Sequence, residues 1–534
     1  MPSTAAGVLI AGTSSDAGKS LVVTGLCRHL ARTGWSVAPF KAQNMSNNSM
    51  VCADGSEIGR AQYLQAQAAR VEPKSAMNPV LLKPGSDRRS FVVLRGQPAG
   101  TLEAGEYATG RRHLAEAAFD AYAELATRFD LIVCEGAGSP AEINLRGGDY
   151  VNLGLARRFD LPVVVVGDID RGGVFASLYG TVALLAPEDR ATIGAFLINK
   201  FRGDRSVLDP GLTDLTRRTG VPFAGVLPWL PDLELDAEDT LEVGRWRSAS
   251  GREDSLRVAV IRLPRVSNVT DVDALATEPG VDVLVTRDPD VVRGADLAIL
   301  PGTRTTVADL EWLRQTGLAD AVVDRARREA PVLGICGGYQ MLAETIVDAV
   351  ESGSANADPA RGEATAGLGL LPVAVEFSAA KVLGRPSGSW RGAEVQAYEI
   401  HHGVAKGTGG SESFLDGCRR GQTWGTMWHG AWENDDFRRA WLAEVAEVAG
   451  SCWRPDPSAT SFSARRETMI DTLADAVAEH VDVELILELA LRQAQGTGQA
   501  QGTALRRAQG TGRAQGTALR RAQGTGQALG TGQV

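Results

Sequence analysis

Residues 334–342 read GICGGYQML and directly follow the apolar run 331–333. A buried strand that turns sharply into a helix would hold Cys336 at the turn, because the neighbouring glycines let the backbone bend there and leave the sulfur exposed. Backbone N–H groups at the start of such a helix favour a thiolate over a thiol. The stretch therefore predicts an α/β unit that carries a nucleophilic cysteine.

The sequence on either side supplies the partners that a nucleophilic cysteine needs. Upstream, an apolar strand runs into PGTRTT at 301–306, whose backbone N–H groups around Gly302 could form an oxyanion hole. Downstream, histidines occur in the segments YEIHHG and GTMWHGAWEN. His429 lies at a strand-to-turn position and is the better candidate for the base, whereas His401 and His402 fit structural or substrate-orienting roles at least as well.

A second chemical motif lies near the N-terminus. A short apolar strand at 7–11 is followed by GTSSDAGKS at 12–20 and by a helical pattern. This is the arrangement of a P-loop, in which backbone N–H groups cradle phosphates, Lys19 reaches the terminal phosphates and Ser20 ligates Mg²⁺. The spacing between its glycines is one residue longer than usual and resembles the loop of dethiobiotin synthetase, an ATP-dependent enzyme that activates a carboxylate. We expect ATP to contact Gly12, Thr13, Asp16, Ala17, Gly18, Lys19 and Ser20.

Polar residues at the ends of later strands extend this predicted site. Lys41 lies where it could touch a transferred phosphoryl group or a substrate carboxylate, since ligands of open α/β sheets bind at the carboxyl ends of strands. Glu135 ends another apolar strand, as in a Walker-B element, and would complete the Mg²⁺ shell begun by Ser20. Asn199 is a candidate to read adenine. Each of these residues alone would also fit a solvated strand end.

Composition limits the classes of protein to consider. A length of 534 residues exceeds one hydrophobic core and indicates two or three domains. The net charge is −10, and without the five Arg of the last 42 residues, which hold no acid, it is −15. Such an acidic body argues against general nucleic-acid binding. Six scattered cysteines without a CxxC pair suggest neither a disulfide framework nor a zinc site.

Targeting patterns are not found either. The N-terminus lacks a basic segment followed by a long apolar run, and no stretch of about 18 consecutive apolar residues occurs in the sequence. We therefore expect a cytoplasmic protein that does not bind a membrane.

The chain divides into five predicted regions. We place an ATP-binding domain at 1–232, a linker at 233–254, a second α/β domain at 255–447, a helical extension at 448–490 and a tail at 491–534. The tail contains three copies of a 14-residue unit, of which the first reads LRQAQGTGQAQGTA. Each copy has almost no apolar surface to bury, so we expect a disordered tail rather than a solenoid.

Nine segments, in this order, resemble the cobyric acid synthase family: GTSSDAGKS, PFKAQNMSNN, CEGAGSPAEINL, GDIDRGGVFAS, INKFRGD, PGTRTT, GICGGYQML, YEIHHG and WHGAWEND. The resemblance covers roughly residues 5–446. It implies an N-terminal P-loop, dethiobiotin-synthetase-like parallel-sheet domain and a C-terminal class I glutamine amidotransferase α/β domain. It also implies a reaction, the amidation of the b, d, e and g carboxylates of the corrinoid adenosylcobyrinic acid a,c-diamide with ATP, Mg²⁺ and glutamine, which gives adenosylcobyric acid.

In the reaction that the resemblance implies, the C-terminal domain hydrolyses glutamine and the ATP-binding domain activates the carboxylate. Cys336, activated by His429, would attack the side-chain carbonyl of glutamine, and N–H groups near Gly302 and Gly337 would hold the oxyanion. The ammonia that is released would displace phosphate from an acyl phosphate made in the ATP-binding domain.

One position departs from the wider glutaminase pattern. Class I glutaminases usually carry a Glu two residues after the His, but Ala431 stands there and the nearest acid is Glu433. Either another turn brings Glu433 to the site or the site works as a Cys-His dyad, and we favour the dyad.

Two other functions stay open from the sequence. One is a related glutamine-dependent amidoligase such as cobyrinic acid a,c-diamide synthase, although the segments KAQNMSNN and DIDRGGVF favour the b, d, e, g enzyme. The other is a nucleotide-binding regulatory protein with an inactive glutaminase-like domain. The intact Cys336 and His429 argue against that second alternative.

Overall fold

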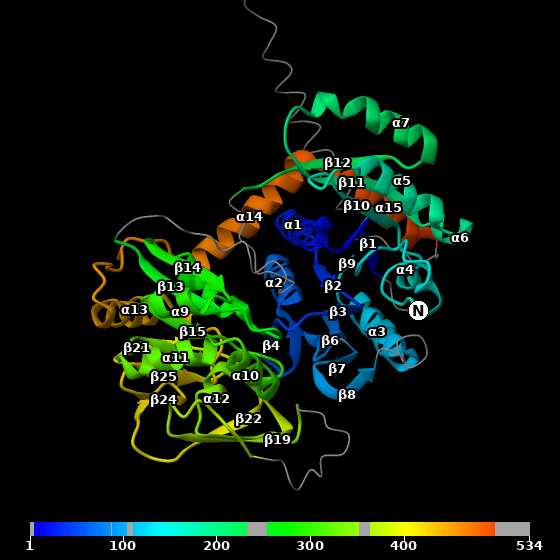
Figure 1. Ribbon diagram of the computed structural model, residues 1–534. Helices are drawn as coiled ribbons and strands as arrows, with labels where there is room; N and C mark the ends of the chain where they lie inside the picture. Colours follow the sequence, from blue (N-terminus) through cyan, green and yellow to red (C-terminus); the bar gives the residue numbers. More distant parts are fainter. Residues whose placement is uncertain (1–4, 87, 104–110, 232–253, 352–363, 497–534) are drawn as a thin grey trace, which may run out of the picture.

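The computed structural model describes residues 5–86, 88–103, 111–231, 254–351 and 364–496. Figure 1 shows two α/β bodies side by side, each built around a central sheet. The predicted linker, apart from its last residue, and the repeat tail from residue 497 onward lie outside the described residues. Helix α15 (Val483–Gly496) continues past residue 490, the predicted end of the helical extension.

The first body is built on a six-stranded parallel sheet, as the sequence predicts. Strand β1 lies in the middle of the sheet, so the glycine loop that follows it opens at the carboxyl edge between two neighbouring strands. In spatial order the strands are β12 (Phe223–Pro228), β11 (Ile193–Phe201), β10 (Val163–Asp168), β1 (Ala6–Gly12), β9 (Leu131–Glu135) and β2 (Val37–Phe40).

Side chains of this sheet alternate between two apolar cores, as the period of a strand requires. On β1, Val8 and Ile10 face one core, while Leu9 and Ala11 face the other. The first core is covered by α1 (Lys19–Arg32), α2 (Arg60–Ala68), α14 (Phe462–His480) and α15. The second is covered by α3 (Arg112–Ala126), α4 (Leu153–Phe159), α5 (Val174–Leu184) and α7 (Asp209–Thr219), with α6 (Pro187–Arg190) near its edge.

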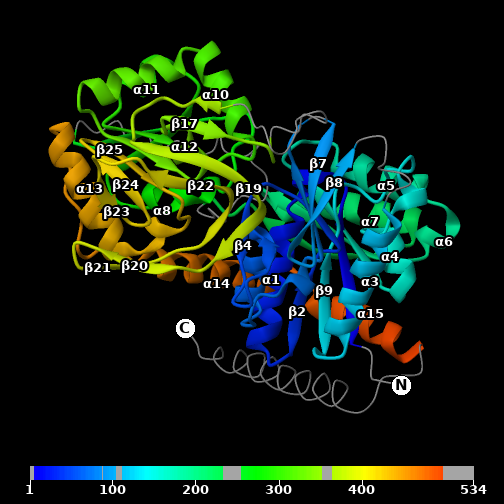
Figure 2. The same cartoon turned by 90° about the horizontal axis from the view of Figure 1, so that it is seen from below.

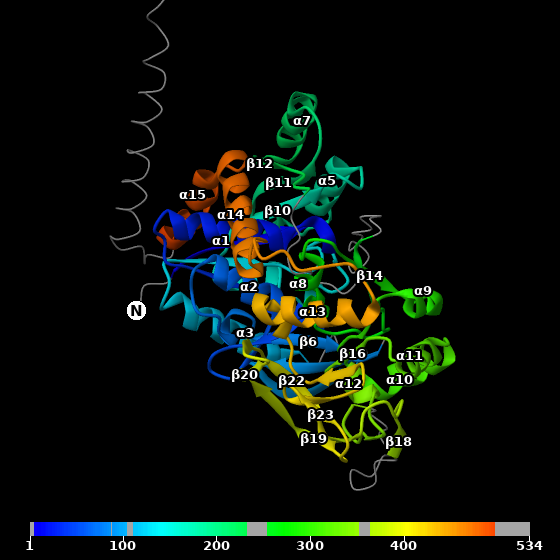
Figure 3. The ribbon, with the colours of Figure 1, turned by 90° about the vertical axis from the view of Figure 1, so that its left-hand side faces the viewer.

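The last two helices of the described chain return to the first body. Figure 3 shows α14 and α15 beside α1, although more than four hundred residues separate them in the sequence. Arg28 and Arg32 of α1 form ion pairs with Glu467 and Asp471 of α14 at 2.8 and 2.7 Å. These C-terminal helices therefore complete a core that the N-terminal strands begin.

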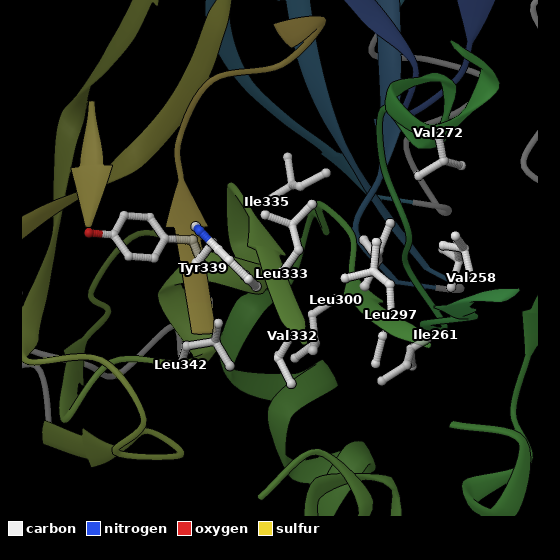
Figure 4. Close-up of a cluster of buried hydrophobic side chains, with 14 of the residues drawn as sticks. Val258, Ile261, Val272, Leu297, Leu300, Val332, Leu333, Ile335, Tyr339 and Leu342 are labelled. Atoms are coloured by element: carbon white, nitrogen blue, oxygen red, sulfur yellow. The ribbon is translucent and has the colours of Figure 1, made fainter. Parts of the chain in front are cut away.

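The second body is built on a seven-stranded sheet with five parallel strands and two antiparallel strands at one edge. In spatial order they are β14 (Val281–Thr286), β13 (Leu256–Ile261), β15 (Leu297–Leu300), β16 (Val332–Ile335), β25 (Thr423–Thr426), β24 (Gly417–Arg420) and β23 (Glu412–Phe414). Figure 4 shows Val258, Leu297 and Leu333 of three adjacent strands in its apolar core. This agrees with the predicted α/β fold.

Six helices accompany the second sheet in the part of the chain that is described. They are α8 (Asp273–Ala276), α9 (Pro289–Gly294), α10 (Thr306–Gln315), α11 (Leu318–Arg327), α12 (Gly337–Met341) and α13 (Asp435–Ala449). Among the described residues, no helix combines the length and the hydropathy that crossing a membrane requires.

Smaller sheets bring the two bodies into contact. The first body adds β3 (Gln43–Met45), β6 (Val80–Pro84), β7 (Arg89–Leu94) and β8 (Gln97–Glu103), and the pair β4 (Ser49–Val51) and β5 (Glu57–Gly59). The second adds β17 (Thr345–Val347), β18 (Ala364–Ala366), β19 (Val373–Gly384) and β22 (Glu399–Gly407), and the pair β20 (Ser387–Trp390) and β21 (Ala393–Gln396). Figure 2 shows β19 reaching towards β4. Val51 packs there in a small buried cluster with Tyr398 and Ile400.

Candidate functional site

Cys336 stands at the turn between β16 and α12, as the sequence predicts. Its backbone has φ +51° and ψ −109°, a conformation that costs a residue other than glycine about 1–3 kcal/mol and is typical of a nucleophile elbow. The helix that follows has only five residues. The dipole of so short a helix supports a thiolate less than we expected from the sequence, so the activating charge must come from elsewhere.

That charge lies on His429, which is held by an aspartate. Nδ1 of His429 lies 2.7 Å from Oδ2 of Asp271, which belongs to the short helix η7 (Val269–Val272). The backbone N–H of Gly430 donates to Oδ1 of the same aspartate at 2.8 Å. The ring of Tyr398 stacks on that of His429 with centroids 5.3 Å apart. The imidazole is therefore fixed in both position and orientation.

The electrostatics of this histidine favour its charged form. Burial alone would lower the pKa of His429, but the negative charges of Asp271 and then Cys336 raise this pKa to about 10. His429 is thus an imidazolium at neutral pH. An imidazolium beside a cysteine is the arrangement in which thiol nucleophiles are activated.

Neither expectation about a third group in this site holds. The carboxylate at His429 is Asp271, so the site is not a dyad, and it is not Glu433 either. Glu433 in η8 (Ala431–Glu433) lies 2.7 Å from Arg60 of α2 and 3.0 Å from Arg466 of α14. Burial would raise the pKa of Glu433, but these two arginines lower it to about 2. Sequence reasoning missed Asp271 because no motif or spacing links it to the histidine.

The predicted oxyanion segments meet beside Cys336. A Cβ atom on Gly337 would lie 2.9 Å from the backbone nitrogen of Thr303, and one on Gly302 would lie 3.2 Å from Cε1 of His429. Such short distances leave little room for a side chain at either position. Gly302 and Gly337 thus allow two backbone segments to approach each other beside Cys336, which is the arrangement that the predicted oxyanion hole needs.

His401 and His402 line the pocket that contains Cys336, but their imidazoles are engaged elsewhere. Nδ1 of His401 lies 2.9 Å from the carbonyl oxygen of Gly403, and Nδ1 of His402 lies 3.0 Å from that of Ser378. Burial, followed by the charge of Arg304, lowers the pKa of His402 to about 4. These contacts agree with the structural or orienting roles that the sequence left open.

The glycine loop of the first body is folded around Lys19. The Nζ atom of Lys19 donates to the carbonyl oxygens of Ser14 and Ser15, both at 2.9 Å, and to that of Gly138 at 3.2 Å. Gly18 has φ +93°, and a Cβ there would lie 2.0 Å from Nδ2 of Asn199. Only glycine meets both conditions, so the loop requires it.

The other predicted ATP contacts lie around this loop. The N–H of Thr13 donates to the carbonyl of Val166 at 2.9 Å, and Asn199 donates from Nδ2 to the carbonyl of Ala17 at 3.0 Å. Asp16 pairs with Arg171 at 2.7 Å. Asn199 therefore supports the loop in this structure, and its contact with adenine stays a prediction.

Glu135 is a fully buried carboxylate at the carboxyl end of β9. Its Oε1 accepts from Ser20 Oγ at 2.9 Å and from Lys41 Nζ at 2.7 Å, and its Oε2 accepts from Gln65 Nε2 at 2.5 Å. The structure thus brings together the predicted residues Ser20, Lys41 and Glu135. A carboxylate beside a hydroxyl at the start of a helix fits Mg²⁺, which takes phosphate oxygens and water as its other ligands.

These two sites define a class of protein. A Cys-His-Asp arrangement on one α/β sheet and a P-loop on another, joined in one chain, are the parts of a ligase that hydrolyses glutamine and uses a nucleotide. The chain matches the CobQ/CobB/MinD/ParA nucleotide binding domain family over residues 8–243 and the CobB/CobQ-like glutamine amidotransferase domain family over residues 257–437.

Similar proteins narrow this class. Cobyric acid synthase of Cutibacterium acnes is 64% identical over 485 residues, which are 90% of this chain and 99% of that protein. Cobyric acid synthase of Streptomyces coelicolor is 56% identical over 491 residues, 90% of this chain and 96% of that protein. A solved glutamine amidotransferase covers 36% of this chain and 98% of its own, with 21% identity and a TM-score of 0.28. The chain belongs to the cobyric acid synthase family.

Proposed function

We propose that the protein uses ATP and glutamine to amidate the b, d, e and g carboxylates of adenosylcobyrinic acid a,c-diamide, giving adenosylcobyric acid. The observation that carries this proposal is the buried Asp271–His429 pair beside the strained Cys336, in the same chain as a P-loop with a carboxylate at Ser20. The names of the relatives support the choice of a corrinoid substrate.

The glutaminase half of the reaction uses the residues around Cys336. The thiolate attacks the amide carbon of glutamine, and N–H groups near Gly302 and Gly337 stabilise the oxyanion. The imidazolium of His429 gives its proton to the departing ammonia, while Asp271 keeps the ring in place. Water then hydrolyses the thioester with His429 as the base, and glutamate leaves.

The ligase half of the reaction uses the carboxyl edge of the first sheet. Lys19 and Lys41 would hold the terminal phosphate of ATP as it passes to a corrinoid carboxylate, and Ser20 and Glu135 would hold Mg²⁺. That ion would neutralise charge on the phosphates. Transfer makes an acyl phosphate, and ammonia displaces phosphate from it to leave an amide. Activation is needed because a carboxylate at neutral pH is a poor electrophile for ammonia.

Mass spectrometry of the corrinoid after incubation with ATP, Mg²⁺ and glutamine tests the proposal. We expect successive mass decrements, each that of an acid converted into a primary amide, until four carboxylates have reacted. The Cys336→Ala variant should give none with glutamine but should regain them with ammonium chloride. An unchanged corrinoid in the wild-type reaction would overturn the substrate assignment. Amidation of cobyrinic acid at only two carboxylates would instead favour an a,c-diamide synthase.

A further inference from the structure

The pocket around Cys336 contains a buried pair of opposite charges that the glutaminase steps leave unused. Arg304, just after β15, donates from its guanidinium to Glu351, just after β17. The two residues are 8% and 7% exposed, and both line the pocket together with Cys336. The ion pair is therefore largely buried, yet it borders the same pocket as the cysteine.

Each member of this pair keeps one unused polar atom. Among the described residues, neither Nε of Arg304 nor Oε2 of Glu351 has a hydrogen-bond partner. Unsatisfied buried donors and acceptors are rare in folded proteins because their desolvation is not compensated. A ligand with an anionic acceptor and a cationic donor at the same end would satisfy both atoms.

We propose that Arg304 binds the α-carboxylate of glutamine and that Glu351 binds its α-ammonium, while the side-chain amide lies at Cys336. This inference rests on the proposed glutaminase function. L-Glutamine carries an amide at one end and both charges at the other. The pocket likewise holds Cys336, which would face the amide, and the pair of Arg304 and Glu351, which would face the charges. The two residues would thereby select glutamine among primary amides.

The protonation of Glu351 agrees with a cationic ligand. Burial raises the pKa of Glu351 to about 7, even though Arg304 acts in the opposite direction. An ammonium group beside this carboxyl would favour its ionised form.

Two other cations line the same pocket and share one carboxylate. Lys83 of β6 and Lys381 of β19 both form ion pairs with Glu57 of β5, which is fully buried. Lys83 also donates to Ser49 Oγ at 2.8 Å. Both oxygens of Glu57 are thus occupied, whereas the pair of Arg304 and Glu351 keeps a donor and an acceptor that have no partner among the described residues.

The first body supports the proposed subsite from across the boundary. The guanidinium carbon of Arg304 lies 3.8 Å from the ring centroid of Phe91 on β7. The N–H of Ser49 donates to Oδ1 of Asn268, another pocket residue, at 2.9 Å. The charged end of glutamine would therefore lie next to the ligase body, and glutamine affinity would depend on how the two bodies dock.

Substrate analogues that lack one charge test this assignment. Ammonia release from glutamine is compared with release from 4-carbamoylbutanoate, which lacks the α-ammonium, and from 4-aminobutanamide, which lacks the α-carboxylate. For the wild-type protein we expect kcat/KM to fall roughly 10- to 100-fold with either analogue. Equal rates with glutamine and both analogues would overturn the proposal without any variant.

Two variants then assign each charge to its residue. Glu351→Gln should lower kcat/KM for glutamine by a similar factor but leave the value for 4-carbamoylbutanoate unchanged, since that analogue has no ammonium to lose. Arg304→Met should likewise lower kcat/KM for glutamine but leave the value for 4-aminobutanamide unchanged, since that analogue has no carboxylate to lose. Arg327→Met, an exposed arginine of α11 in the same body, is the matched control and should change neither value. If Glu351→Gln slows glutamine and 4-carbamoylbutanoate equally, its role is structural and the assignment is wrong.

Amidation with ammonium chloride reports whether each variant is folded, because it bypasses the pocket. Glu351→Gln and Arg304→Met should keep the wild-type rate in this assay. If either does not, Glu351→Asp or Arg304→Lys takes its place, and the same selectivity is expected with a smaller loss. Should the wild-type protein fail to amidate the corrinoid, the proposed function fails, whereas the ammonia-release comparison still decides the glutamine subsite.

Discussion

At the scale of single residues, the glutaminase site joins positions that lie far apart in the chain. Asp271 and His429 are separated by 158 positions, yet their side chains are 2.7 Å apart. Cys336 and His429 could be predicted because a strand followed by a small-residue turn marks a nucleophile, and the chain holds few histidines. Asp271 could not, since only the packing of η7 against η8 brings it there. Charge partners made by tertiary packing leave no local pattern in a sequence.

The first prediction concerns Asp271→Asn. This change keeps the shape of the side chain but removes the charge that holds His429 as an imidazolium. We expect kcat for glutamate release to fall roughly 10²- to 10⁴-fold, the range for loss of acid-base catalysis. Amidation with ammonium chloride should stay at the wild-type rate. Glutamate release within about twofold of wild type would show that Asp271 is not part of the catalytic site.

The second prediction concerns the pH dependence of stability. The pKa of His429 is about 10 in the folded protein, against about 6.5 in an unfolded chain. Because the folded value is the higher one, the stabilisation is complete below about pH 6.5 and disappears as the pH rises towards 10. The melting temperature of the wild-type protein should exceed that of Asp271→Asn most at pH 6 and least at pH 10. A difference that does not vary with pH would contradict the assignment of this ion pair.

At the scale of elements, the nine-residue helix α2 contacts both the ligase site and the segment that follows His429. At its N-terminus, Arg60 pairs with Glu433, four residues after His429. Further along, Gln65 donates to Glu135. The helix therefore connects Glu135 of the first body with the segment of the second body that contains His429.

The third prediction tests α2 with Arg60→Met. Loss of the ion pair with Glu433 should uncouple the two sites, so that more glutamate is released for each amide formed. Couplings between sites are typically 5- to 150-fold, and we expect the ratio of glutamate released to amide formed to rise by up to a factor in that range. The control is Arg112→Met, an exposed arginine of α3. A wild-type ratio of glutamate to amide in Arg60→Met would argue against α2 as the connection.

The sequence was more informative about strands than about the elements between them. The apolar strands and the turns at Gly18 and Cys336 follow from local patterns, and both sheets were predicted. The five-residue length of α12 was not, because residues 342–346 contain no glycine or proline that would mark the end of a helix. The small sheets β3–β8 were also missed, since short strands with mixed polarity carry little periodicity.

At the scale of the whole molecule, the C-terminal helices belong to the N-terminal core. Ile470 and Val477 of α14 are buried in the same cluster as Val8 and Ile10 of β1. The predicted amphipathic helices do occur at this end of the chain, but their destination could not be predicted. An amphipathic pattern shows that a helix needs a partner surface without showing which one.

The fourth prediction follows from this arrangement and uses two truncations. A chain that ends at residue 496 keeps α14 and α15, and we expect its melting temperature and amidation rate to equal those of the full chain. A chain that ends at residue 460 loses both helices and exposes the apolar face of the first sheet. It should be recovered mostly as aggregate or melt well below the full chain. Equal melting temperatures for the two truncations would show that the helices are dispensable.

The return of α14 and α15 to the first body also affects the order of events during synthesis. Domains near the N-terminus usually fold first, while the rest of the chain is still being made on the ribosome. Here one face of the first sheet is covered by α14 and α15, which are translated more than two hundred residues after its last strand. The first core therefore cannot be completed until those helices have been made. The glutaminase body, whose sheet and core lie within one continuous stretch of chain, can therefore reach its native packing before the ligase body does.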